Sequence, residues 1–305
     1  MGLNVDEIKF LLWAKSEGVD FTKVMMLGRH GLHLDAASMR SVLSAFGISK
    51  SEFDADAIFT SQTGYHGTFS GYAEPFLKFL GAVETSSIDA SSYEGATHIL
   101  DMNQPIAQDL KERFTVVLDS GTLEHIFNFP TAIRNCMEMV QLNGHFIAIA
   151  PCNNHAGHGF YQFSPELFFR VFDEQNGFKV KRMILFEAPS MGTWYELQDP
   201  EEMGKRVEFR TWWRHCHLAV LARRTSIKPI FGTTPQQSDY SQAWRAHEQS
   251  AKSGGQAAVE QPSAANRIRR SVPQPIKKVC WKLMEFATRM TNPGAFKVIR
   301  VPESK

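Results

Sequence analysis

The segment from Phe114 to Pro151 constrains the fold more than any other part of the sequence. It begins with a β-branched, apolar run at 115–118, of the kind that a parallel sheet buries on both faces. Apolar residues then recur at helical spacing over 132–140, and we expect the pair Asn143–Gly144 to end that helix. A second apolar run at 145–150 completes a strand–helix–strand unit. The sequence therefore predicts an α/β fold around a mostly parallel sheet.

Other segments supply the remaining elements of such a sheet. We expect further strands at 23–27, 86–88, 97–100, 178–186 and 215–222. We expect helices at 6–18, 36–46, 51–60 and 72–80, and another that starts at the N-cap residue Ser164. Residues 33–70 exceed what a minimal strand–helix–strand unit needs, so we interpret them as an insertion that could form a lid.

Composition divides the chain into four parts. Residues 1–20 form an N-terminal helix and residues 21–225 form the α/β domain. Residues 226–265 are predicted to be a flexible linker, because Gln, Ser, Ala and Gly dominate much of the segment. The remaining tail, 266–305, is basic, with ten Lys or Arg residues against two Glu. The tail is either a solvated extension or a peripheral membrane helix, because apolar residues share a helical stripe beside lysines over 276–286.

Charge and cysteine content limit the classes of partner. The net charge is +1, so the chain as a whole lacks the electrostatic signature of a nucleic-acid binder. The 4 cysteines form no CxxC pair, which fits a reducing compartment and argues against a disulfide framework or a zinc ribbon. The N-terminal residues lack the apolar core of a signal peptide, and no apolar run approaches the ~20 residues of a membrane span. We therefore expect a cytoplasmic protein without a nucleic-acid partner.

Acidic residues follow three of the predicted strands. Asp89, Asp101 and Asp119 each come where a short apolar run ends. Ligands of open α/β sheets bind outside the carboxyl ends of the strands, so these acids are candidate binding residues. A carboxylate such as Asp89 can accept two hydrogen bonds from a vicinal diol. Asp119 has a simpler alternative role as a cap for the helix that follows it.

The strand order, the acids at successive strand ends and an antiparallel closing pair resemble the class I S-adenosylmethionine-dependent methyltransferases. The resemblance covers about residues 20–224. It is strongest to methyltransferase-like proteins acting on sugars and small molecules that occur with bacterial surface-glycan genes, through LDSGTLEHIFN and GHGFYQFSPELFF. It implies a Rossmann-like sheet with an antiparallel last strand, helices on both faces, and S-adenosylmethionine over its carboxyl edge.

The resemblance also implies roles for single residues. Asp89 would hold the ribose hydroxyls, Asp101 and Met102 would flank the adenine, and Asp119 would lie beside the methionine moiety. The departure from the family lies in the first glycine loop, Leu27 to Gly31, which carries no acid before its glycines.

Gly28 and Gly31 can still let the backbone approach a ligand closely. The missing acid would normally contact the amino group of the cofactor. Asp35 or Glu74 are the residues that could replace it.

Three histidines are candidates for a general base, because an imidazole titrates near neutral pH. His125 follows Glu124, while His155 and His158 lie in a polar loop after the 145–150 strand. His158 stands between two glycines, which can hold an exposed side chain in an unusual backbone conformation. The alternative is that all three are ordinary loop histidines. No acid lies at ligand spacing beside His155 and His158 in the sequence, so we expect no metal site.

These observations predict an enzyme that methylates an oxygen of a sugar or another small hydroxylated acceptor. The alternative is a non-catalytic binding or scaffold protein on a degenerate methyltransferase fold. A nicotinamide dehydrogenase is disfavoured, because GxGxxG is absent. Trp194, Trp212 and Trp213 either line a sugar pocket or pack in the core. Packing is the expected role of four aromatic residues, Tyr161, Phe163, Phe168 and Phe169.

Overall fold

The computed structural model describes residues 2–59, 71–188, 193–209, 214–252 and 295–302. Its strands are β1 Gly2–Leu3, β2 Lys23–Leu27, β3 Gly31–Leu32, β4 Glu84–Asp89, β5 His98–Ile99, β6 Phe114–Ser120, β7 Val140–Asn153, β8 Phe178–Glu187, β9 Thr193–Leu197, β10 Cys216–Arg224 and β11 Phe296–Arg300. The helices are α1 Val5–Ser16, α2 Ala36–Ala45, α3 Ala55–Ile58, α4 Glu74–Phe79, α5 Phe129–Met139, α6 Pro165–Val171, α7 Pro200–Met203 and α8 Ser238–Lys252. Three single 3₁₀ turns are η1 Gln108–Leu110, η2 Leu123–His125 and η3 Glu174–Asn176. No helix in these ranges is long and apolar enough to cross a bilayer.

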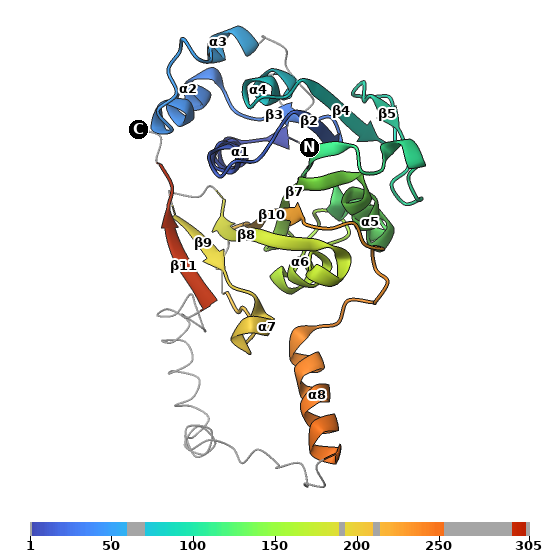
Figure 1. The fold of residues 1–305 in the computed structure, drawn as a ribbon. Coiled ribbons are helices and arrows are strands. Elements are labelled where there is room, and N and C mark those ends of the chain that lie inside the picture. Colours follow the sequence, from blue (N-terminus) through green and yellow to red (C-terminus); the bar gives the residue numbers. More distant parts are fainter. Residues whose placement is uncertain (1, 60–70, 189–192, 210–213, 253–294, 303–305) are drawn as a thin grey trace.

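Nine strands form the central sheet, in the order β11–β9–β8–β10–β7–β6–β2–β4–β5 (Figure 1). The strands β5, β4, β2, β6 and β7 are parallel, whereas β10 runs antiparallel to both β7 and β8. The Rossmann-like sheet with an antiparallel last strand is thus confirmed. The chain builds outward from β2 to β4 and β5, and then returns to place β6 on the other side of β2. Such a reversal of strand order marks the usual ligand crevice of an open α/β sheet.

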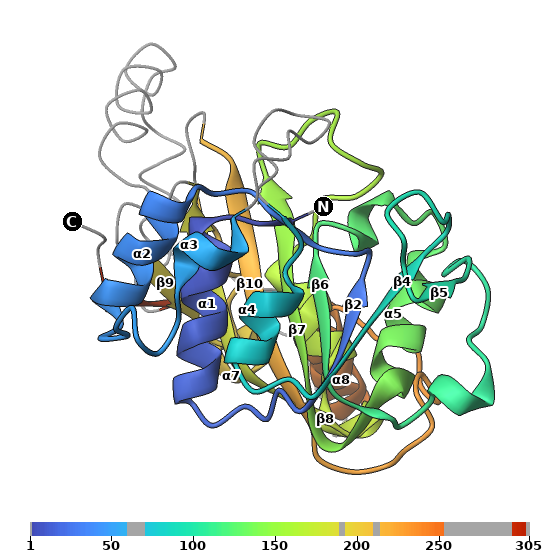
Figure 2. The same cartoon turned by 90° about the horizontal axis from the view of Figure 1, so that it is seen from above.

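Alternating residues of the strands pack in two separate hydrophobic cores, because successive side chains point to opposite faces of the sheet. In β2, Met25 and Leu27 join the core beneath α5 and α6, whereas Val24 and Met26 join the core beneath α1, α2 and α4. Figures 1 and 2 show these helices on the two sides of the sheet. Phe163, Phe168 and Phe169 are buried in the first core and Tyr161 packs against it, as expected.

The N-terminal helix is part of the second core and not a separate unit. Asn4 caps α1 through a capping box with Glu7, which fixes where the helix begins. Phe10 of this helix is fully buried and its ring centroid lies 5.9 Å from that of Trp194. Trp194 is only 1% exposed. Its role is core packing, and the alternative of a sugar pocket is wrong for this residue.

The pair Asn143–Gly144 does not end a helix, as the sequence suggested. Helix α5 ends at Met139 and β7 begins at Val140, so the pair lies inside the strand. Asn143 has a φ of 66°, and the pairing of β6 with β7 shifts register here. A Cβ at Gly144 would lie 3.0 Å from the carbonyl oxygen of Phe114. The two residues form a bulge, and bulges select the same residue types as helix ends.

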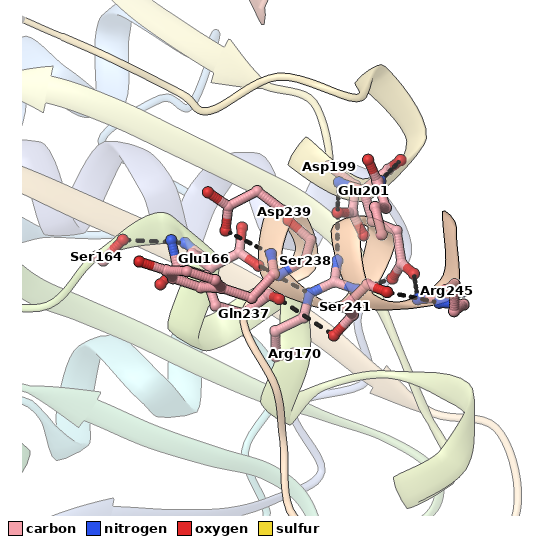
Figure 3. Close-up of polar contacts among 12 residues, drawn as sticks. Ser164, Glu166, Arg170, Asp199, Glu201, Gln237, Ser238, Asp239, Ser241 and Arg245 are labelled. Carbon is pink, nitrogen blue, oxygen red and sulfur yellow. Dashed lines mark hydrogen bonds and ion pairs between the residues drawn. The ribbon is translucent and has the colours of Figure 1, made fainter. Parts of the chain in front are cut away.

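The region predicted as a flexible linker contains α8, so that prediction is wrong for residues 238–252. Polar contacts dock this helix on α6 and α7 (Figure 3). Arg170, whose side chain is 11% exposed, pairs with Asp199 and Glu201, and Arg245 of α8 reaches Glu201 at 2.8 Å. The Ser238 backbone N–H donates to Glu166 Oε1 at 2.7 Å. The Gln- and Ser-rich composition obscured this helix, which polar and charged groups dock on the domain.

Part of the basic tail is also integral to the fold. Strand β11 pairs antiparallel with β9 along its five residues, and the flanking Ala295 is fully buried. The description of 266–305 as only an extension is therefore wrong at 295–302. The expected amphipathic helix at 276–286 lies outside the described residues, as do Trp212 and Trp213. The same holds for residues 60–70 of the expected lid, whereas α2 of that segment packs in the core.

Removing β11 should destabilise the domain. We expect a chain that ends at residue 294 to melt about 4–8 °C below a chain that ends at residue 302, as for a loss of about 2 kcal/mol. The reason is that the truncation unpairs β9 and exposes the apolar groups around Ala295. Differential scanning calorimetry of the two chains measures the difference. Equal melting temperatures would show that β11 adds nothing to the sheet.

His30 is a fully buried histidine in the turn after β2. Its Nε2–H donates to the Leu27 carbonyl oxygen at 2.8 Å, and its Nδ1 has no hydrogen-bond partner among the described residues. Burial disfavours the imidazolium and lowers the pKa of His30 to about 4. The turn is therefore built around a neutral imidazole.

His30 should make stability depend on pH. The unfolded chain protonates this residue near pH 6.5, whereas the folded protein resists protonation until about pH 4. The stability that the neutral imidazole provides is therefore fully present above pH 6.5. As the pH falls below 6.5 the free energy of unfolding decreases, and this loss reaches about 2 kcal/mol at pH 5.

Urea unfolding at pH 7 and pH 5 tests this against His30→Gln, which keeps a donor for Leu27. The wild type should lose about 2 kcal/mol more than the variant between the two pH values. Parallel losses in both proteins would mean that His30 is accessible to protons.

Candidate functional site

The loops after β2, β4 and β6 meet at one edge of the sheet. Leu27 at the end of β2 pairs with Ile88 of β4 on one side and with Asp119 of β6 on the other. The Gly28 backbone N–H donates to the Ile88 carbonyl oxygen at 2.7 Å, and Gly28 has a φ of 70°. The structure thus brings Gly28, Asp89 and Asp119, three of the predicted cofactor residues, to the carboxyl edge of the sheet, where the strand order reverses.

One carbonyl group ties the loops after β2 and β6 together. The Leu27 oxygen accepts from His30 Nε2 and also from Thr122 Oγ1, at 2.6 Å. Thr122 in turn donates its backbone N–H to Asp119 Oδ1 at 3.0 Å. These bonds fix the start of the β6 loop relative to the glycine turn.

Gly31, another of the predicted cofactor residues, is paired with the N-terminal segment of the chain. It lies in β3, buried, and pairs with Gly2 of β1. A Cβ at Gly2 would lie 2.6 Å from the Gly31 carbonyl oxygen and 1.8 Å from the His33 ring. Glycine at position 2 therefore permits the close approach of these two segments, and Gly31 lies in the short ladder that they form.

Arg29 bridges the loops on the β4 side of the crevice. Its Nε pairs with Glu74 Oε1 at 2.7 Å, its Nη1 donates to the Glu94 carbonyl oxygen at 3.1 Å, and its guanidinium stacks 3.7 Å from the Tyr72 ring centroid. Glu74 therefore stands at the glycine turn. Asp35, the other candidate for the missing acid, is the N-cap of α2 and accepts from the Ser38 backbone at 2.7 Å.

The remaining predicted cofactor residues differ in accessibility. Asp89 is half-buried and accepts from the Ser91 backbone at 3.0 Å. Asp101 is exposed, and bonds from the Asn103 backbone and side chain lower its pKa. Met102 is 6% exposed and faces the core, where Asn135 of α5 donates to its carbonyl oxygen at 3.3 Å. Met102 thus anchors the loop more than it presents a surface.

Asp119 is fully buried and holds the turn that leads into η2, whereas the N-cap of the next helix, α5, is Asn128. Asp119 Oδ1 accepts from the backbones of Thr122 and Leu123, which starts η2, and its Oδ2 has no partner within the described ranges. Burial, reinforced by the nearby Glu124 carboxylate, raises the pKa of Asp119 well above its usual range. Asp119 positions the loop that carries Glu124 and His125.

That loop brings an acid and two histidines together. Glu124 is 1% exposed, and its Oε1 lies 3.5 Å from Nε2 of His158. The rings of His125 and His158 meet edge to face with centroids 5.1 Å apart. One ligand atom of each of Glu124, His125 and His158 lies within 4.8 Å of the others. We call these three residues the Glu–His–His cluster.

Glycines allow the loop of His158 to reach Glu124. Gly157 and Gly159 have φ values of 85° and 73°, as the sequence predicted for an unusual backbone. A Cβ at Gly159 would lie 2.8 Å from the Glu124 carbonyl oxygen. That oxygen accepts from the Phe160 backbone N–H at 2.7 Å. The approach of the two loops therefore depends on glycine at position 159.

His155 belongs to a second group of rings. It is 7% exposed and its centroid lies 4.5 Å from that of His215 and 4.6 Å from that of His217. Burial, together with His215 and His158, lowers the pKa of His155 to about 4. Of the three predicted bases, the structure joins His125 and His158 around Glu124 and leaves His155 behind them.

Sequence reasoning missed the role of Glu124. The expectation of no metal site relied on acids near His155 and His158 in sequence, but the acid comes from a turn more than 30 positions earlier. The available signal was Leu-Glu-His directly after a strand that ends in an acid. Two exposed rings, Phe127 and Phe160, were also missed; they lie 5.7 Å apart beside the cluster.

No family model matches the chain, and no curated protein matches it. Among solved structures, the N-methyltransferase NodS from Bradyrhizobium japonicum WM9 is 10% identical over 72% of this chain and 96% of its own, with a TM-score of 0.37.

Two other similar structures come from further organisms. The Burkholderia thailandensis 1,6-didemethyltoxoflavin-N1-methyltransferase is 12% identical over 73% of this chain and 78% of its own, with a TM-score of 0.35. The branched-chain polyamine synthase from Thermus thermophilus is 11% identical over 77% of this chain and 60% of its own, with the same TM-score. We therefore base the function on the topology and the residues of this chain.

Proposed function

We propose that the protein transfers the methyl group of S-adenosylmethionine to a hydroxyl oxygen of a sugar or another small hydroxylated acceptor. One observation carries the proposal. The strand order reverses at β2, and the same edge holds an acid-terminated neighbouring strand on one side and the Glu–His–His cluster on the other. This arrangement offers a cofactor crevice next to a place where a hydroxyl can lose its proton.

The cofactor would lie over the ends of β2 and β4. Gly28 presents backbone at the turn, and the half-buried Asp89 has the chemistry to bind the ribose hydroxyls. Asp101 and Met102 line the next loop and would border the adenine. Glu74, now paired with Arg29, is the acid that would meet the amino group in place of the missing one.

The chemistry requires alignment and deprotonation. Methyl transfer from a sulfonium is an in-line displacement, so the protein must hold the acceptor oxygen opposite the sulfur and exclude water. We assign removal of the hydroxyl proton to the Glu–His–His cluster, in which the His158 side chain is 54% exposed. Phe127 and Phe160 offer ring surfaces of the kind that pack on a sugar. The free cysteines support a cytoplasmic setting.

A scaffold function on the same fold is the second candidate, and the glycine turn favours it. Arg29 spans this turn with three contacts, and Gly31 is paired with Gly2 in a short parallel ladder. A cofactor would therefore have to displace or share the Arg29 side chain. Binding of the cofactor decides between the two candidates.

The role of Asp89 can be tested by cofactor binding. Asp89→Ala should weaken binding of S-adenosylhomocysteine by about 1.5–3 kcal/mol, as for the loss of charge-assisted hydrogen bonds. Asp109→Ala, which removes an exposed carboxylate in η1, is the matched control and should leave the affinity unchanged. Isothermal titration calorimetry measures both. If Asp89→Ala binds as tightly as the wild type, the ribose assignment is wrong.

The role of His158 can be tested by turnover. His158→Ala should reduce turnover by about 10²–10⁴-fold, the usual share of proton transfer in catalysis. The affinity for S-adenosylhomocysteine should stay within about twofold, because the loop would touch the acceptor and not the adenosine. His155→Ala should lose less, since its ring lies behind the cluster.

A radiolabelled methyl-transfer assay over a panel of sugars and small hydroxylated compounds measures these rates. Normal turnover by His158→Ala and by His125→Ala would remove the cluster from the mechanism. Methyl transfer would then depend on alignment alone.

A further inference from the structure

Glu124, His125 and His158 have the composition and spacing of a three-ligand metal site. A carboxylate and two imidazoles bind transition cations at about 2.0–2.2 Å, which puts neighbouring ligand atoms about 3.4 Å apart. Glu124 Oε1 and His158 Nε2 are 3.5 Å apart, so this pair already has the required separation. His125 completes the group within 4.8 Å. Both histidines are exposed, so small side-chain rotations can close the remaining gap.

A second observation, independent of the spacing, also indicates a ligand. Glu124 is 1% exposed, yet its Oε2 has no hydrogen-bond partner among the residues that the structure describes. A buried carboxylate without full compensation is costly, and its oxygens are normally paired or bound to a metal. Burial disfavours the charged carboxylate and raises the pKa of Glu124. A cation next to Oε1 would offset this cost.

The cluster is also rigid where a metal needs rigidity and open where a substrate needs access. Backbone N–H groups of Phe160 and Tyr161 donate to the Glu124 carbonyl oxygen at 2.7 and 3.2 Å, so the backbone that carries the acid is held in place. The two histidines face outward from that fixed point. Three protein ligands with an open side are typical of catalytic zinc and related sites, whereas structural sites are closed by a fourth ligand.

We propose that Glu124, His125 and His158 bind a divalent transition-metal cation, with zinc as the best match. Nitrogen and carboxylate ligands favour zinc, cobalt or manganese over magnesium and calcium, which prefer oxygen alone. The open positions would take the acceptor hydroxyl.

The role of the cation rests on the proposed methyl transfer, but its binding does not. The bound hydroxyl would have a lowered pKa and would release its proton to water. The oxygen would then attack the methyl carbon as the carbon–sulfur bond breaks, which leaves S-adenosylhomocysteine as a neutral thioether. His158 then acts as a ligand that holds the metal, and His158→Ala still reduces turnover.

Metal titration of the untagged full-length protein tests the site directly. We expect calorimetry with zinc chloride, without cofactor, to show one cation per chain, and cobalt chloride to give the visible absorption of a site with few ligands. Magnesium chloride should give no heat in the same range. Glu124→Gln, His125→Ala and His158→Ala should each weaken zinc binding at least ~100-fold, more than the loss of an outer-shell partner.

Two histidine variants outside the cluster serve as matched controls. His215→Ala removes an exposed ring from the neighbouring group, and His247→Ala removes one from α8. Both should bind zinc as the wild type does. Because His125 and His158 are exposed, their variants should fold, and circular dichroism checks this for all three.

The proposal is wrong if the wild type binds no zinc, or if folded His125→Ala and His158→Ala bind it normally. It is also wrong if His215→Ala loses binding as strongly, since the metal would then belong to the His155 group. A protein that binds S-adenosylhomocysteine but no zinc would overturn only the metal site. A protein that binds zinc but neither cofactor would overturn only the methyl transfer.

Discussion

The parallel pairing of β2 with both β4 and β6 is the constraint on which the rest depends. Because the chain builds in one direction from β2 and then in the other, the connections that follow these strands part at their carboxyl ends. The three loops that leave them are instead tied to one another. The Leu27 carbonyl oxygen accepts from the β2 and β6 loops, and Arg29 links the β2 loop to the β4 loop. The site is thus a consequence of sheet topology, stabilised by a few buried polar contacts.

Much of this could be predicted from the sequence, because the signals are local. Runs such as 115–118 and 145–150, rich in β-branched residues, favour buried strands, and an acid directly after such a run is expected at the carboxyl edge. Asp89 and Asp119 were therefore placed correctly. Gly157 and Gly159 have the positive φ values that their spacing around His158 suggested. In each case the residue type alone restricts the backbone.

What could not be predicted depends on partners far apart in the chain. Helix α8 lies in a Gln- and Ser-rich segment, and its docking is evident only once Arg170, Glu201 and Arg245 are together. Strand β11 needs the edge of β9, and Glu124 meets His158 only because Gly159 lets two loops touch. For the same reason the sequence does not reveal that Gly31 pairs with Gly2.

The central claim is that one edge of the sheet holds S-adenosylmethionine beside a metal-bound acceptor site. A crystal structure of the protein grown with S-adenosylhomocysteine and zinc tests this most directly. The account predicts the adenosine over the ends of β2 and β4 with its ribose on Asp89. It also predicts an anomalous zinc peak between Glu124, His125 and His158, with the cofactor sulfur facing it. Crystals soaked at saturating cofactor that show an undisturbed Arg29 and an empty crevice would contradict the account.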